Sequence, residues 1–159
     1  MIYLKVVGCG LVALSGVAIS ASLNKRCRCA LRCAESWERL FAHIKNQVEC
    51  FSLPIGEILS RIEPTLLRQC GYSGRMTPTD ISELVRGTLF ADGETARIAE
   101  SFASEFGKCY KREQVSRCEY FIALAEERRK KLSAELPSKI KLYATLSAAT
   151  SLGVIILFV

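Results

Sequence analysis

The glycines near the amino terminus are the first residues whose spacing matches a ligand-binding pattern. Gly8, Gly10 and Ala13 form the pattern G-x-G-x-x-A after a short apolar stretch, and in dinucleotide-binding folds such glycines let backbone amides approach a pyrophosphate. That fold also needs a second strand and an acidic residue about 20 positions further on. Here the apolar run continues instead: residues 6–24 carry no charge, and the first aspartate is Asp80. The sequence therefore disfavours an oxidoreductase and predicts no cofactor.

Eight cysteines raise the question of a metal or redox centre. Cys27, Cys29 and Cys33 form the one close cluster, but zinc sites normally use four ligands at spacings such as C-x-x-C. The cluster lacks a fourth ligand, and His43 is the only histidine. We therefore expect no metal site, and we expect the neighbouring arginines to lower the pKa of the clustered thiols and make them easier to oxidise. Three other cysteines are expected to be small core residues: Cys50, Cys70 and Cys118.

The sequence contains no recognisable catalytic constellation. It lacks the patterns G-x-x-x-x-G-K-[ST], H-E-x-x-H and G-x-S-x-G. His43 lies beside the apolar stripe of a predicted helix, where packing or exposure to solvent is the usual role. Glu57, Glu63 and Asp80 lie near predicted loops without a partner for acid–base chemistry. The sequence therefore predicts no catalytic residues and a protein that is not an enzyme.

Two apolar segments at the ends of the chain are predicted to be transmembrane helices, over residues 1–24 and 142–159. At 1.5 Å per residue they would extend roughly 33 Å (residues 2–23) and roughly 27 Å, against a bilayer core of about 30 Å. Alternatives remain at both ends. The first segment could be a signal peptide, although the basic cluster that follows resists translocation. The second could be a buried helix of a soluble domain.

Charge is concentrated between these segments. Of the 22 lysines and arginines only Lys5 lies outside residues 25–141, and all 16 acidic residues lie inside. Basic residues gather where this middle segment meets the apolar ends, which predicts a multi-pass protein whose middle segment is cytoplasmic and contacts anionic lipids. Nucleic-acid binding is disfavoured because the basic residues alternate with acids. The predicted membrane-flanking residues are Lys25, Arg26, Arg28, Arg128, Arg129, Lys139 and Lys141.

The apolar periodicity of the middle segment, residues 25–141, predicts an antiparallel helical bundle, so the expected fold class is all-α. A first helix over 25–49 and four later helices each carry an apolar stripe. Pro54 is expected at a helix start, and Pro64 is expected to end or restart that helix. A further helix is expected to begin with Thr77 as its cap and Pro78 in its first turn, and Gly107 is expected to end the next. The residues predicted to face inward include Cys33, Trp37, Leu40, Phe41, Ile44, Val48, Ile55, Ile58, Leu59, Ile62, Ile81, Leu84, Val85, Leu89, Ile98, Phe102 and Phe106.

The last helix of the bundle is predicted over residues 110–136. Its apolar residues follow a heptad that only Arg129 interrupts, and its acidic residues precede basic residues by four positions, which favours ion pairs along an exposed face. Pro137 is expected to kink or break the chain before the final apolar segment.

Three passages resemble the stage III sporulation protein AB family of endospore-forming bacteria. Residues 52–59, SLPIGEIL, are similar to the family's P-L-P-E-A-L element, and residues 102–114 are similar to its F-x-x-x-L-G-x-S-D-x-x-x-Q passage. Residues 143–147 are similar to the Y-R-S-L-G entry to the last span. Their order and spacing extend over nearly the whole chain. The sequence departs from the family at Cys109 and Tyr110, which replace Ser-Asp, and lacks the arginine after Tyr143.

The resemblance implies a function as well as a fold. The family belongs to a channel in the mother-cell membrane that faces the forespore, and its soluble domain is similar to the platform domains of type II secretion F-type proteins. It implies a non-catalytic platform that links a hexameric ATPase to the other stage III channel proteins. The alternative is a membrane-tethered helical adaptor unrelated to sporulation. The candidate partner surface comprises the loop-proximal residues Arg61, Arg68, Arg75 and Arg86.

Overall fold

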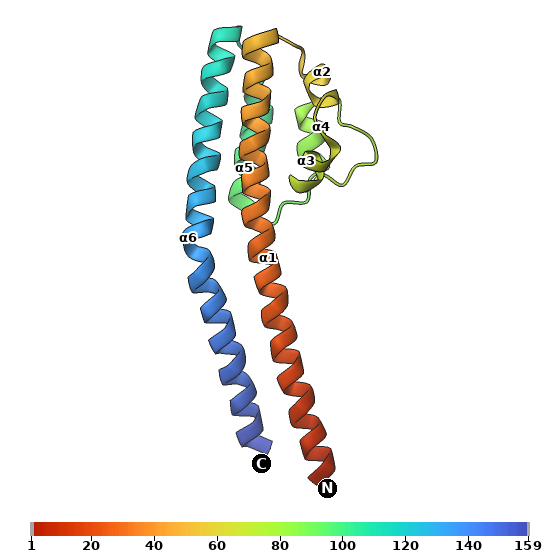
Figure 1. The fold of residues 1–159 in the computed structure, drawn as a ribbon, viewed down its shortest axis with the longest axis vertical. Helices are drawn as coiled ribbons and strands as arrows, with labels where there is room; N and C mark the ends of the chain where they lie inside the picture. Colours follow the sequence, from red (N-terminus) through yellow and green to blue (C-terminus); the bar gives the residue numbers. More distant parts are fainter. Residues whose placement is uncertain (1, 159) are drawn as a thin grey trace. The chain divides into compact units, whose positions relative to one another are not determined.

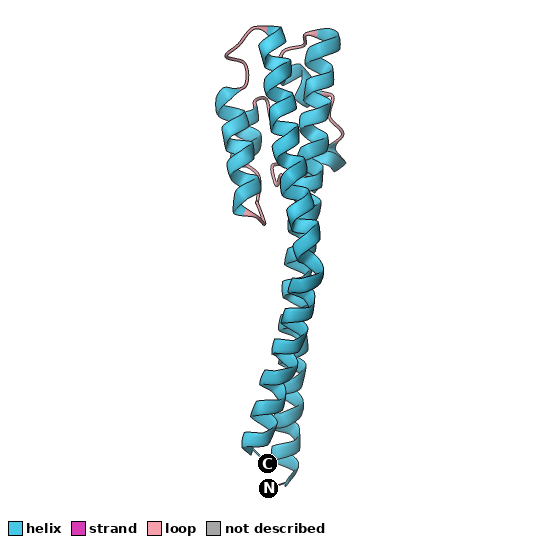
Figure 2. Cartoon of the chain, turned by 90° about the vertical axis from the view of Figure 1, so that its left-hand side faces the viewer, coloured by secondary structure: helices cyan, strands magenta, loops and turns pink. Residues whose placement is uncertain are grey.

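The chain is mostly helical in the described part of the computed structural model, which comprises the backbone of residues 2–158 and the side chains of residues 18–150 and Gly153. Its helices are α1 (Ile2–Phe51), α2 (Ile55–Ser60), α3 (Pro64–Gln69), α4 (Ile81–Arg86), α5 (Gly93–Glu105) and α6 (Lys111–Phe158) (Figure 1). Among these residues there is no strand, only an isolated antiparallel bridge between Tyr72 and Thr88 (Figure 2). The predicted all-α class is confirmed.

The predicted membrane spans fall partly beyond the described side chains. Residues 1–17 of the first span, and residues 151, 152 and 154–159 of the second, lie outside them. Within the part of the chain that is described, no helix combines the length and the apolar character needed to cross a membrane.

The chain divides into two compact units. Unit 1 comprises residues 1–28 and 133–159, and unit 2 comprises Cys29–Leu132. In unit 1, α6 continues through Pro137, so of the predicted kink or break the break is wrong. Pro137 is exposed, which lets water bind the carbonyl that loses its amide partner, and Lys139 pairs with Glu135 across the proline at 2.6 Å.

Three phenylalanines join the main helices of unit 2. The ring of Phe41 in α1 lies 4.5 Å from that of Phe102 in α5 and 6.3 Å from that of Phe121 in α6. The rings of Phe102 and Phe121 are 5.3 Å apart and nearly perpendicular, a favoured geometry for aromatic pairs. All three side chains are buried. The inward faces predicted for Phe41 and Phe102 are therefore confirmed, whereas Phe121 was absent from the predicted core.

Trp37 joins α1 to the short helices on its other side. Its indole Nε1 donates a hydrogen bond to the carbonyl of Cys70 at the end of α3, at 3.1 Å, and its ring stacks on Phe90 with centroids 5.6 Å apart. The thiol of Cys33 donates to the same Cys70 carbonyl. Since both lone pairs of this buried carbonyl have donors, the end of α3 is held firmly against α1.

The short helices follow the predicted signals with two corrections. α3 starts at Pro64, which is one of the two outcomes predicted there. α4 starts at Ile81 with Asp80 as its cap, not with Thr77. The amide of Thr79 instead binds the carboxylate of Glu83 at 2.8 Å. Leu89, predicted to face inward, is 76% exposed because α4 ends at Arg86 and the chain leaves the helical path, so the stripe stops at Val85.

The loop after α3 requires glycine at position 71. Its φ is +98°, and a Cβ there would lie 2.8 Å from the carbonyl oxygen of Leu89. Only glycine tolerates this backbone at so close an approach. The amide of Leu89 donates to the Gly71 carbonyl at 2.9 Å, so the loop lies directly against the residues after α4.

Truncation of the central aromatic cluster tests the core assignment. Phe102→Ala should lower the free energy of unfolding by about 3–5 kcal/mol, because it removes a buried ring and leaves a cavity. Leu89→Ala, which truncates an exposed side chain, should change it by less than about 0.5 kcal/mol. Urea denaturation of both variants followed by circular dichroism measures the difference, and equal losses would contradict the burial described.

Candidate functional site

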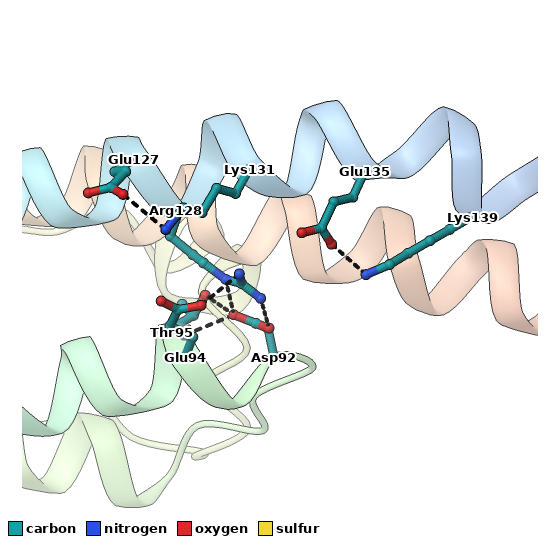
Figure 3. Close-up of polar contacts among 8 residues, drawn as sticks. All are labelled: Asp92, Glu94, Thr95, Glu127, Arg128, Lys131, Glu135 and Lys139. Carbon is teal, nitrogen blue, oxygen red and sulfur yellow. Dashed lines mark hydrogen bonds and ion pairs between the residues drawn. The ribbon is translucent and has the colours of Figure 1, made fainter.

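Arg128 of α6 is held in an ion-pair cluster at the start of α5 (Figure 3). Its guanidinium donates to both carboxylate oxygens of Asp92, at 2.9 and 2.6 Å, and lies 2.7 Å from Glu94. The side chains of Arg128 and Asp92 are only 15% and 12% exposed. Asp92 also caps α5 by accepting from the amide and hydroxyl of Thr95. The cluster therefore couples the start of α5 to α6.

The cluster shifts the titration of Asp92. Hydrogen bonds from Arg128, followed by those from Thr95, lower the pKa of Asp92 to about 2, although burial opposes the shift. A bidentate arginine–carboxylate pair of this kind is strong and fixes its geometry. The sequence predicted a turn at Asp92 but not this pairing, because the two residues are far apart in the chain.

Arg129 is also paired inside unit 2. It interrupts the apolar heptad of α6, and its Nε donates to Glu38 of α1 at 2.6 Å. The predicted helical pairs are present too: Glu126 with Lys130 at 2.8 Å and Glu127 with Lys131 at 2.9 Å. Of the residues predicted to flank the membrane, Arg128 and Arg129 therefore have tertiary partners. The others lie in unit 1, all exposed except the half-buried Lys139: Lys25, Arg26, Arg28, Lys139 and Lys141.

The candidate partner arginines are all exposed. Arg61 follows α2 and pairs with Glu57 at 2.6 Å, and Arg68 lies in the last turn of α3. Arg75 lies in the loop after α3, and Arg86 ends α4. The structure brings that loop and the end of α4 together, since the amide of Ser73 donates to the carbonyl of Gly87 at 3.0 Å.

Exposed apolar residues accompany these arginines. Met76 is 83% exposed and Leu89 76% exposed. Tyr72 connects their segments, because its hydroxyl donates to the carbonyl of Met76 at 2.9 Å. Sequence reasoning missed both residues, since it expected Leu89 to face the core.

The cysteines correct two predictions and confirm that Cys70 and Cys118 are core residues. Cys33, Cys70 and Cys118 are buried, and burial raises the pKa of Cys33 and Cys118 to about 11 and that of Cys70 still higher. The predicted lowering by arginines is therefore wrong for Cys33, because desolvation of the thiolate outweighs nearby positive charge. Cys50 is exposed, contrary to the prediction. Among the described residues, no group of three or more histidine, cysteine or acidic side chains could hold a metal ion.

A cavity of about 440 Å³ opens at the end of unit 2 where α5 turns into α6. Its lining comes from the end of α1, the loop to α2, the start of α4 and residues 103–114. Residues of two passages singled out in the sequence, 52–59 and 102–114, meet here. Sequence reasoning did not identify this groove, because its walls come from these four separate segments.

Comparisons with known proteins give no relative of this chain: no family model, curated protein or solved structure matches it. Two surfaces are candidates for binding a partner. One comprises the exposed arginines with Met76 and Leu89, and the other is the groove at the turn from α5 to α6.

The Asp92–Arg128 pair predicts a pH-dependent stability. The folded pKa of Asp92 lies below its unfolded value of about 3.9, so the stabilisation is present above pH 4 and lost as the pH falls toward 2. A shift of this size corresponds to about 2 kcal/mol. Asp92→Asn should therefore be less stable than wild type at pH 7, and the difference should shrink by more than half between pH 5 and pH 2.5.

Urea denaturation at several pH values checks this. Glu127→Gln is the matched control, because it breaks an exposed pair with Lys131 and should cost less than about 0.5 kcal/mol at any pH. A difference between wild type and Asp92→Asn that stayed constant with pH would show that the carboxylate charge does not contribute.

Proposed function

We propose that this protein is a membrane platform component of the sporulation channel between mother cell and forespore, and that it couples a secretion-type ATPase to the channel without catalysing a reaction. The resemblance of residues 52–59, 102–114 and 143–147 to the stage III sporulation protein AB family supports the proposal. The all-α fold is consistent with the helical platform domain that this resemblance implies.

The continuity of the two long helices carries the proposal. α1 and α6 extend without a break from unit 2 into the charge-free segments 6–24 and 142–159. A small helical domain whose first and last helices run directly into two apolar segments is suited to transmit force or position between a membrane and a partner.

The use of the carboxylates in unit 2 supports a non-catalytic role. Asp80 and Asp92 cap helices, and Glu105 and Glu113 both pair with Arg117. Carboxylates engaged in this way stabilise the fold and are poorly placed to exchange protons with a substrate.

In this proposal the basic residues of unit 1 lie at the cytoplasmic membrane surface. Lys25, Arg26, Arg28 and Lys141 are exposed, and positive residues at the cytoplasmic ends of membrane helices orient them and attract anionic lipids. The domain between α1 and α6 then faces the cytoplasm, where the ATPase is.

The ATPase-binding surface in this proposal consists of Arg61, Arg68, Arg75 and Arg86 with the neighbouring Met76 and Leu89. Exposed methionine and leucine surrounded by arginine match the composition of protein interfaces, where arginine and methionine are enriched. Reversal of these charges leaves the core untouched, because all four arginines are exposed.

A quadruple variant tests the proposal. Changing Arg61, Arg68, Arg75 and Arg86 to Glu should leave helicity and membrane insertion intact, abolish co-purification with the ATPase and block spore formation. The control variant changes Arg32, Arg39, Arg97 and Lys130 to Glu, which alters the net charge equally at other exposed positions, and should retain both activities.

The outcomes separate the alternatives. A quadruple variant that binds the ATPase and sporulates normally would place the contact elsewhere. A wild-type protein that co-purifies with no secretion-type ATPase would favour a membrane-tethered adaptor unrelated to sporulation. Equal defects in the two variants would show that net charge matters and not this surface.

A further inference from the structure

The groove at the turn from α5 to α6 has an apolar floor. Val48 of α1, Leu53 of the following loop and Ile81 of α4 contribute to it, together with Ala103 and Phe106 from the end of α5. Its volume of about 440 Å³ is enough for one or two large apolar side chains. The site lies wholly within unit 2, so its geometry does not depend on the position of unit 1.

One cation lines the groove, and two more are next to lining residues in the chain. Lys111 lines the cavity, and Lys108 and Arg112 are its exposed neighbours in the chain. None of the ion pairs formed by described residues includes these three cations. The nearby acids Glu105 and Glu113 are instead both bound by Arg117, at 3.1 and 3.0 Å.

The one acidic residue that lines the groove is already engaged. Asp80 accepts a hydrogen bond from the amide of Ile81 at 2.8 Å and caps α4. Gln114, the buried polar residue of the lining, accepts from the amide of Gly107 at 3.2 Å and holds the turn in place. Gln114 and Asp80 therefore hold the backbone around the groove in place, and the three cations Lys108, Lys111 and Arg112 outnumber Asp80, the one acidic residue of the lining.

Exposed aromatic side chains border the same end of the unit. Tyr110 is 91% exposed and Phe51 is 64% exposed, and each is next in the chain to a residue of the lining, Cys109 and Ser52 respectively. Large exposed aromatic residues beside an apolar cavity are typical of the centres of protein interfaces.

We propose that this groove binds an acidic segment of a partner protein, which inserts an apolar side chain into the cavity and places its carboxylates against Lys108, Lys111 and Arg112. The charge of the rim selects the partner, because a basic or neutral segment leaves these cations without counter-charges. The apolar floor requires a leucine-like or phenylalanine-like anchor. This surface is separate from the arginine surface of the proposed function and does not depend on it.

The test measures binding of a defined peptide to the full-length chain in phosphatidylcholine nanodiscs. The probe is a fluorescein-labelled peptide with a central Leu-Leu-Phe flanked on each side by three glutamates, and its matched peptide has glutamines instead. Fluorescence polarisation should show at least tenfold tighter binding of the glutamate peptide. The triple variant Lys108→Glu, Lys111→Glu and Arg112→Glu should weaken that binding at least tenfold.

Two further variants complete the design. Ala103→Trp should fill the groove and weaken binding of both peptides, with circular dichroism used to check its fold. Arg68→Glu with Arg75→Glu and Arg86→Glu removes the same charge from the arginine surface and should leave the affinity within twofold. This control also separates failure of this inference from failure of the proposed function.

Three results would overturn the inference. Equal binding of the two peptides would show that charge is not recognised. Equal weakening by both charge variants would indicate a general electrostatic attraction. Absence of binding to the wild-type chain by either peptide would show that an acidic apolar segment is not the occupant.

Discussion

The contact of Phe41, Phe102 and Phe121 is the interaction on which the rest of unit 2 depends. It brings one ring from each of α1, α5 and α6 to a common point, and a three-way contact fixes the relative rotation of three helices where a two-way contact would not. Since side chains on each helix follow its rotation, this contact sets where Arg128 meets Asp92 and where the walls of the groove converge. Truncation of one ring therefore affects polar contacts that it does not touch.

α1 makes contacts on two sides, and Trp37 lies next to the phenylalanine cluster. One side of α1 packs on α5 and α6, while the indole binds the carbonyl of Cys70 and so positions the short helices. Those helices are too short to be stable alone, so their packing against α1 holds them in place. Their exposed residues are not needed for that packing. Both surfaces for which we propose a partner draw on these short segments and on their loops.

Ion pairs determine which charged side chains of unit 2 remain available to another molecule. Arg128, Arg129 and Arg117 take up the carboxylates of Asp92, Glu38, Glu105 and Glu113. Lys108, Lys111 and Arg112, beside the groove, are among the described cations that no ion pair includes, as are Arg68, Arg75 and Arg86 of the other proposed surface. The pairing therefore leaves uncompensated positive charge at both surfaces for which we propose a partner.

The sequence by itself determined the helices, their apolar stripes and several of the helix ends marked by proline or glycine. These features follow from periodicity and backbone geometry within a few residues. Trp37, Leu84 and Phe102 were predicted to be buried and are. Only the tertiary structure decided that Arg128 and Arg129 would be paired, that Cys50 would be exposed, and that Leu89 would leave the core. Each of these depends on which residue of a distant helix lies opposite, and the periodicity of one helix does not contain that information. The groove could be predicted least of all, since it exists only once four separate segments of the chain have packed together.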